Sequence, residues 1–192
     1  MAEQSRLAIA LLAAGQSRRF GTEDKLAADL NGRMLGLHAS DTLSGIPAAH
    51  HWVIASSGEH PCAAGWRKQG FEITVNPDAR EGLGTSVALA AQLAHNARAD
   101  ALLIALADMP YVTPEHFTAL AELADPQVLA ASHNGTANTP PAIFGREHFP
   151  ALMQSSGDRG AGALLARAKI IPCPPEQLAD IDLPSDLTSR HD

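Results

Sequence analysis

A cluster of cations stands in one loop of an otherwise acidic chain. Arg18, Arg19 and Lys25 follow an apolar run at residues 7–12 and the small residues 13–15. Small residues let a ligand approach the backbone, and loop amides can form a concave anion site. These types and spacings suit a phosphate cradle, although a glycine-containing connection with solvated charges would look the same. The loop carries neither the Walker pattern nor the three-glycine dinucleotide pattern.

Carboxylates occur at two places that could hold a metal ion. Asp108 directly follows a second apolar run at residues 101–107. Near the end of the chain, Asp180, Asp182 and Asp186 place three acids within seven residues. Mg²⁺ takes few carboxylates and completes its shell with water and phosphate oxygens. A turn cap at Asp108 and a solvated tail at 180–186 are the alternatives, and sequence spacing does not separate them.

Two glycine-rich segments also lead into helical patterns. Residues 76–86 end in Gly82-Leu-Gly-Thr-Ser86, and residues 156–162 read Ser-Gly-Asp-Arg-Gly-Ala-Gly. Free amides and hydroxyls at a helix start could hold a base, a ribose or a phosphate. Taken alone, residues 76–86 would also serve as a helix cap with glycine turns.

The elements that must position these residues alternate between strand and helix. Short apolar runs predict strands at 7–12, 51–55, 71–75, 101–107 and 127–132. Apolar spacing predicts helices over 85–97 and from Thr113 to about 124, the latter opened by a capping hydroxyl and a proline. This order predicts an α/β fold of three layers, with a mostly parallel, Rossmann-like sheet between helices. Active sites in such sheets lie beyond the carboxyl ends of the strands.

Composition limits the classes of protein to consider. The 192 residues predict one domain spanning 1–192, and the net charge of -7 with 4% aromatic residues argues against a nucleic-acid partner. No apolar run approaches a membrane span, and the polar start lacks a signal segment, so a cytoplasmic protein is expected. Cys62 and Cys173 are expected to be ordinary thiols, and the scattered histidines suggest no catalytic or metal site.

These segments, in this order, resemble the nucleotidyltransferases that act on molybdenum cofactor. The motif of residues 12–21 with Lys25 carries the resemblance, and later blocks at 82–86, 108–110, 140–144 and 180–182 extend it over nearly the whole chain. The block Gly157-Asp-Arg-Gly-Ala161 narrows it to the cytidylyltransferase branch. The related guanylyltransferases usually carry two glycines where this chain has Ala14 and Gly15, which points to CTP rather than GTP.

The resemblance implies a sheet of the nucleotide-diphospho-sugar transferase type and a role for each matching residue. The implied reaction is attack of a terminal phosphate of the pterin cofactor, molybdopterin, on the α-phosphate of CTP, with release of pyrophosphate. Arg19, Lys25 and Asp108 would be catalytic, and Asp108 and Asp182 would hold Mg²⁺. The nucleotide would contact Leu12, Ala13, Ala14, Gly15, Lys25, Gly84, Ser86 and Asp108, and the acceptor would contact Gly157, Asp158 and Gly160. A client molybdoenzyme of the xanthine-dehydrogenase type is a further implied partner.

The chain departs from the family pattern in three places. Phe20 stands where methionine is commoner, and three residues rather than two separate Gly21 from Lys25. Residues 134–139 match the acceptor-side segment weakly. Three alternatives therefore remain at this stage: a GTP-dependent enzyme, a transferase for another phosphorylated acceptor, and a non-catalytic chaperone of the cofactor. Asp180 is an alternative to Asp182 as the second metal ligand.

Overall fold

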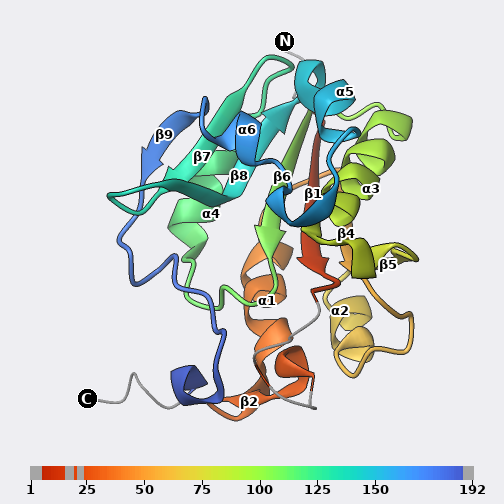
Figure 1. Ribbon diagram of the computed structural model, residues 1–192, viewed down its shortest axis with the longest axis vertical. Coiled ribbons are helices and arrows are strands. Elements are labelled where there is room, and N and C mark those ends of the chain that lie inside the picture. The colour runs from red at the N-terminus through yellow and green to blue at the C-terminus, as the bar shows by residue number, and fades with distance from the viewer. Residues whose placement is uncertain (1–5, 16–19, 21–23, 188–192) are drawn as a thin grey trace.

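The structure is a computed structural model that describes residues 6–15, 20 and 24–187. The strands are β1 (Leu7–Ala13), β2 (Asp29–Leu30), β3 (Arg33–Met34), β4 (His50–Ala55), β5 (Glu72–Val75), β6 (Ala101–Leu106), β7 (Leu129–His133), β8 (Asn138–Gly145) and β9 (Lys169–Pro172). The α-helices are α1 (His38–Ser44), α2 (Ala63–Lys68), α3 (Leu83–Asn96), α4 (Pro114–Ala121), α5 (Phe149–Leu152) and α6 (Gly162–Leu165). Figure 1 shows their arrangement.

Within the described residues, the main sheet has seven strands in the order β5-β4-β1-β6-β8-β7-β9. Strand β1 lies inside the sheet, between β4 and β6 and parallel to both. Every residue of β1 is buried, as expected for a continuous apolar strand that is covered on both faces. The strand predictions at 7–12, 51–55, 71–75, 101–107 and 127–132 each correspond to a strand of this sheet.

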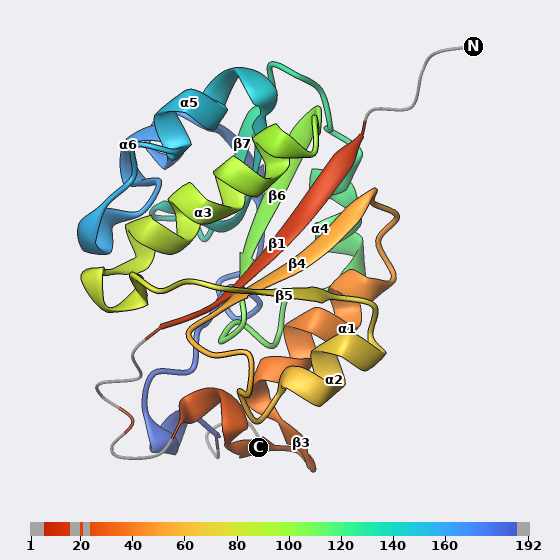
Figure 2. The ribbon, with the colours of Figure 1, turned by 90° about the vertical axis from the view of Figure 1, so that its right-hand side faces the viewer.

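Helices cover both faces of the sheet, which confirms the predicted three layers (Figure 2). Leu43 of α1, Trp66 of α2 and Phe117 of α4 are buried in the core on one face. Val87 of α3 and Phe149 of α5 are buried in the core on the other face. Successive residues of β1 alternate between these two cores, so this strand separates them.

Strand β8 is the main element that the sequence did not predict. It pairs antiparallel with both β6 and β7, whereas the other neighbours in the sheet are parallel. Two prolines, Pro140 and Pro141, interrupt its strand pattern, and proline cannot donate to a ladder. The register shifts between Ala131 and Ser132 of β7, opposite these prolines, so they need no ladder partner.

None of the helices in the described part of the chain is both long and apolar enough to cross a membrane. Cys62 and Cys173 are free and buried. Burial and the nearby charge of Asp24 raise the pKa of the Cys62 thiol to about 12, so this thiol is unreactive at neutral pH.

Candidate active site

Three of the predicted site residues meet beyond the carboxyl end of β6. The ammonium of Lys25 donates to Asp108 Oδ2 at 2.7 Å and to Asp182 Oδ1 at 3.2 Å. The Lys25 side chain is only 10% exposed, so water screens these contacts poorly. Burial alone would lower the pKa of Lys25, but the carboxylates of Asp108 and Asp182 outweigh it and raise that pKa. Lys25 is therefore held as a charged ammonium between two carboxylates.

The backbone explains why residues so far apart in sequence meet here. Asp108 lies two residues beyond β6, where the buried strand ends. The amide of Ile181 donates to the carbonyl of Asp108, and the buried Ile181 side chain anchors the C-terminal segment in the core. The Asp186 carboxylate accepts from the amides of Asp182 and Leu183, which fixes the turn that carries Asp182.

Asp108, Asp180 and Asp182 form a group suited to a divalent cation. One oxygen from each lies within 4.8 Å of the others. Among the described residues, the buried Oδ1 of Asp108 finds no hydrogen-bond partner, and a buried unpaired carboxylate oxygen is costly. Partial burial and the charges of Asp182 and Asp108 raise the pKa of Asp180. A cation would satisfy the unpaired oxygen and relieve the repulsion, so these residues fit Mg²⁺.

The two predicted glycine segments pack against each other. A Cβ on Gly82 would come within 2.4 Å of the backbone of Gly157, and one on Gly84 within 2.6 Å of the backbone of Ser156. Gly82 also adopts a φ of 114°, which favours glycine. The start of α3, predicted for the nucleotide, and the Gly157–Gly160 segment, predicted for the acceptor, thus lie side by side (Figure 2).

Replacing Gly84 by alanine should separate these two segments. The added methyl would overlap backbone atoms rather than a flexible side chain, and overpacking costs about 1–3 kcal/mol. We expect a fall in the melting temperature of about 3 to 10 °C, measured by thermal unfolding. Gly162→Ala is the matched control, because a Cβ there meets nothing within 4 Å. Equal melting temperatures for the two variants would contradict the close packing.

Asn76 follows β5 and supports the start of α3, a role that the sequence pattern does not indicate. It is 3% exposed, and its amide donates to the hydroxyls of Thr85 and Ser86 at 2.9 Å. It therefore ties the loop after β5 to the first turn of α3. Ser86 is equally buried, with 3% of its surface exposed, so its hydroxyl stabilises the loop from the protein interior. Direct contact of Ser86 with a nucleotide stays a prediction. A polar residue at the end of a strand-like run was the available signal for Asn76.

The other predicted residues lie at the end of β1 or outside the described residues. Leu12, Ala13 and Ala14 are buried and Gly15 is exposed, so the small residues bring the chain to the surface at Gly15. Arg19 falls outside the described residues, and its catalytic role stays a prediction. In Gly157–Gly160, Gly157 and Gly160 are half-buried and the Asp158 side chain is exposed.

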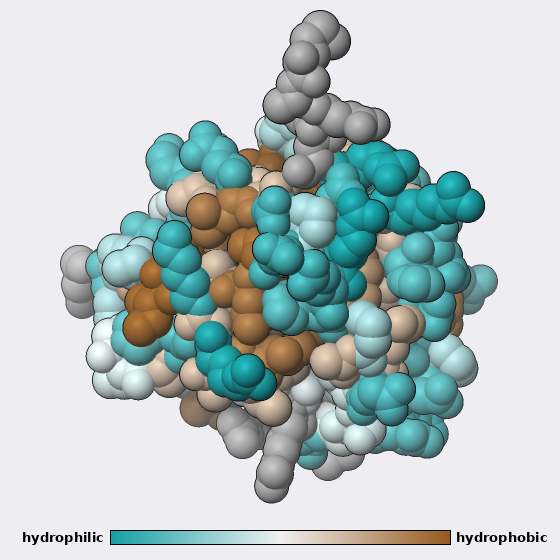
Figure 3. Space-filling view, turned by 90° about the horizontal axis from the view of Figure 1, so that it is seen from above, coloured by the Kyte–Doolittle hydropathy of each residue, from teal (hydrophilic) through white to brown (hydrophobic). Residues whose placement is uncertain are grey.

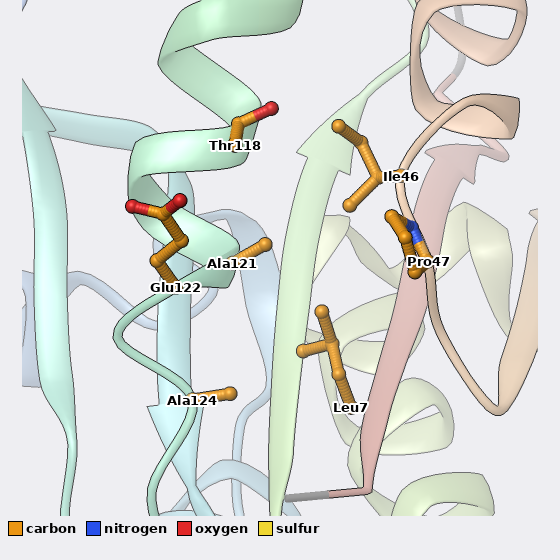
Figure 4. A pocket seen from close by; sticks show the side chains of 7 residues that line it. All are labelled: Leu7, Ile46, Pro47, Thr118, Ala121, Glu122 and Ala124. Carbon is orange, nitrogen blue, oxygen red and sulfur yellow. The ribbon is translucent and has the colours of Figure 1, made fainter. Parts of the chain in front are cut away.

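Two hollows in the described surface differ in chemistry. One, of about 210 Å³, lies between α3, α6 and the sheet and is apolar, with Leu12, Leu106, Phe144 and Ala161 among its lining residues. The other, of about 370 Å³, lies between α4 and the start of β1 (Figure 4). The end of the molecule at which β1 begins shows hydrophobic patches among hydrophilic side chains (Figure 3). The described lining of this second hollow has Glu122 as its charged residue and no cation, so a triphosphate does not suit it.

Comparisons with known proteins identify the family and the fold. Residues 9–171 match the model of the MobA-like NTP transferase domain. The chain is 34% identical over 190 residues to purine catabolism protein PucB of Bacillus subtilis (strain 168), covering 91% of each chain. It is similar in fold to a nucleotidyl transferase from Methanothermobacter thermautotroptrophicus, with a TM-score of 0.74, 20% identity and coverage of 95% and 94%. Molybdopterin-guanine dinucleotide biosynthesis protein A from Archaeoglobus fulgidus gives a TM-score of 0.67, 18% identity and coverage of 94% and 95%.

Proposed function

Because the chain belongs to the MobA-like NTP transferase family, and so is a nucleotidyltransferase, we propose that it transfers CMP from CTP to molybdenum cofactor. The observation that carries the proposal is the meeting of Lys25, Asp108 and Asp182 beyond the end of β6. Nucleotidyl transfer from a triphosphate needs a positive side chain beside the phosphates. It also needs carboxylates that hold a metal ion next to that side chain. The site supplies both within hydrogen-bond distance.

The proposed reaction exchanges one phosphoanhydride bond for another. An oxygen of the terminal phosphate of molybdopterin attacks the α-phosphorus of CTP. The new P–O bond forms as the bond from the α-phosphorus to the bridging oxygen breaks, and that oxygen leaves with pyrophosphate. The attacking phosphate is already ionised near neutral pH, so no general base is required. Catalysis of this kind depends on positioning and charge stabilisation.

Each charged residue has a part in that stabilisation. Lys25 and Arg19 would neutralise the charge of the triphosphate and of the leaving pyrophosphate. Asp108, with Asp182 or Asp180, would hold Mg²⁺, which when bound supplies positive charge to the phosphate oxygens. The backbone from Leu12 to Gly15 would hold the nucleotide at the end of β1.

We propose that the acceptor binds beside the glycine segments that pack against each other at residues 82–84 and 156–160. The apolar hollow of about 210 Å³ adjoins these segments, because its lining residue Ala161 directly follows Gly160. We assign this hollow to the ring system of the acceptor and residues 157–160 to its polar groups. The name of the Bacillus subtilis relative refers to purine catabolism, which supports a client molybdoenzyme of the xanthine-dehydrogenase type.

CTP is proposed over GTP because of Ala14. The residue stands where the guanylyltransferases that this chain resembles usually carry glycine, and its side chain is 4% exposed at the end of β1. Thermal unfolding with CTP, GTP, ATP or UTP, each with and without Mg²⁺, tests this choice. A ligand at 100 times its dissociation constant adds about 2.7 kcal/mol. For a chain of this length, that corresponds to a rise of about 5 to 10 °C in melting temperature.

We expect a Mg²⁺-dependent rise with CTP that the other nucleotides do not match. The same mixture with molybdopterin should then release pyrophosphate. A larger rise with GTP would overturn the choice of CTP and leave the transferase intact. Absence of pyrophosphate release with any nucleotide, in the presence of molybdopterin and Mg²⁺, would overturn the proposed transfer itself.

A further inference from the structure

A buried histidine lies next to the site, and its neighbours decide which tautomer its ring adopts. His60 is 6% exposed and stacks on Trp66 with the ring centres 4.8 Å apart. Its Nδ1 accepts from the backbone amide of Cys62 at 3.0 Å, so Nδ1 carries no proton. The proton of the neutral ring is therefore on Nε2, which lies 2.7 Å from Asp24 Oδ2 and donates to it.

Asp24 uses its two carboxylate oxygens for two different partners. While Oδ2 accepts from His60, Oδ1 accepts from the backbone amide of Leu26 at 3.0 Å. The second bond is an N-cap, and it opens the short 3₁₀ turn η1 (Lys25–Ala27). Lys25 is the first residue of that turn. The bond from His60 thus acts on the backbone from which the Lys25 side chain departs.

We propose that His60 is a positioning residue for Lys25, acting through the cap that Asp24 places on the turn η1. The consequence of this inference for catalysis rests on the proposed function. His60 does not touch the reacting groups in this scheme. It fixes the direction in which Lys25 reaches the carboxylates of Asp108 and Asp182.

The segment that carries His60 is itself well anchored to the same turn. Cys62 Sγ donates to the carbonyl of Leu26 at 3.2 Å, and Trp66 Nε1 donates to the carbonyl of Gly36 at 2.8 Å. The segment before α2 therefore contacts both the turn and the chain that follows it. This anchor also explains how the longer spacing between Gly21 and Lys25 is tolerated, because Asp24 fixes the lysine locally.

The position of Lys25 can be measured without any nucleotide. The chain has three lysines, at positions 25, 68 and 169, and Lys68 and Lys169 are exposed. Competitive labelling with a small amine reagent, followed by peptide mass spectrometry, gives the reactivity of Lys25 relative to the other two in one sample. In the wild type, burial and the two carboxylates should keep Lys25 much less reactive than both.

Four variants separate the cap from general packing. In His60→Gln, the amide reaches the place of Nε2 and can still donate to Asp24, whereas in His60→Asn it is too short. Both lose the stack on Trp66, and only His60→Asn keeps an acceptor near the place of Nδ1 for the Cys62 amide, so a rise in Lys25 labelling in His60→Asn alone would come from the lost bond to Asp24. Asp24→Ala removes the capping carboxylate. The Asp24 side chain is 39% exposed, so its loss leaves no cavity in the core. His116→Gln is the control, because His116 is 8% exposed and bonds to Ser132 in β7.

We expect labelling of Lys25 to rise about fivefold in His60→Asn and in Asp24→Ala, the effect of losing an N-cap, and not in His60→Gln or His116→Gln. The double variant His60→Asn/Asp24→Ala should show no further rise, since both changes break one link. The turnover number should fall by a similar factor in the same variants, with a smaller change in KM. Unchanged labelling in folded His60→Asn and Asp24→Ala would overturn the positioning role. The expected labelling without nucleotide transfer in the wild type would overturn only the proposed function.

Discussion

Asp108→Asn is expected to lower the rate of nucleotidyl transfer about 10²- to 10³-fold, the cost of losing one electrostatic stabiliser in an active site. The substitution keeps the size of the side chain and removes its charge. Asp108 contributes the carboxylate that contacts Lys25 at 2.7 Å and the buried oxygen that has no partner among the described residues. Both features serve a cation, so the fold should survive their loss. Pyrophosphate release at several Mg²⁺ concentrations measures the effect.

The loss should be greatest at limiting Mg²⁺, because Asp182 and Asp180 alone would hold the ion more weakly. Asp41→Asn is the matched control: Asp41 also pairs with a cation, through two bonds to Arg33, on an exposed surface outside the site. Exposed ion pairs contribute little to stability, so this variant should keep wild-type turnover. Near-normal turnover of Asp108→Asn at limiting Mg²⁺ would contradict its assignment to the metal.

Strands that are apolar throughout and buried on both faces were predictable from the sequence. Strands whose pairing depends on the geometry of a neighbouring strand were not. Strands β1 and β6 are apolar throughout and buried on both faces, so local composition alone indicates them. Strand β9 has mostly exposed residues, and its pairing depends on β7 being in place. Strand β8 carries two prolines that only the bulge in β7 makes acceptable. The partner of β9 is remote in sequence, whereas β8 directly follows its partner β7, and the bulge that accommodates its prolines leaves no mark in the sequence pattern.

The same distinction between local and remote signals applies to the residues of the site. A carboxylate after a buried strand and a lysine after a glycine loop are local signals, and they correctly indicated that Asp108 and Lys25 lie at the carboxyl edge of the sheet. The link from His60 to Asp24 leaves no local signal, because it joins segments 36 residues apart through one hydrogen bond. Packing of Gly82 and Gly84 on residues 156–158 was equally hidden. Contacts between loops depend on the whole fold.

Replacing Lys25 by methionine should weaken catalysis and strengthen metal binding in the same variant. Lys25→Met should lower transfer about 10²- to 10³-fold, because the charge that stabilises the triphosphate is lost. The same variant should bind Mn²⁺, a probe for the divalent cation, about tenfold more tightly without nucleotide, since charged hydrogen bonds of this kind contribute about 1.5 kcal/mol or more. In the wild type, the ammonium occupies the carboxylates of Asp108 and Asp182 that the cation needs.

Electron paramagnetic resonance of free Mn²⁺ measures the affinity, and Lys68→Met, at an exposed position, is the control for both readouts. Partial unfolding cannot produce the expected pattern, because it would weaken metal binding and catalysis together. Unchanged or weaker Mn²⁺ binding by Lys25→Met would show that the ammonium does not compete with the cation. The expected gain would mean that Lys25 holds the carboxylates together before the substrate arrives. Binding of metal and triphosphate would then move the lysine from the carboxylates to the phosphates.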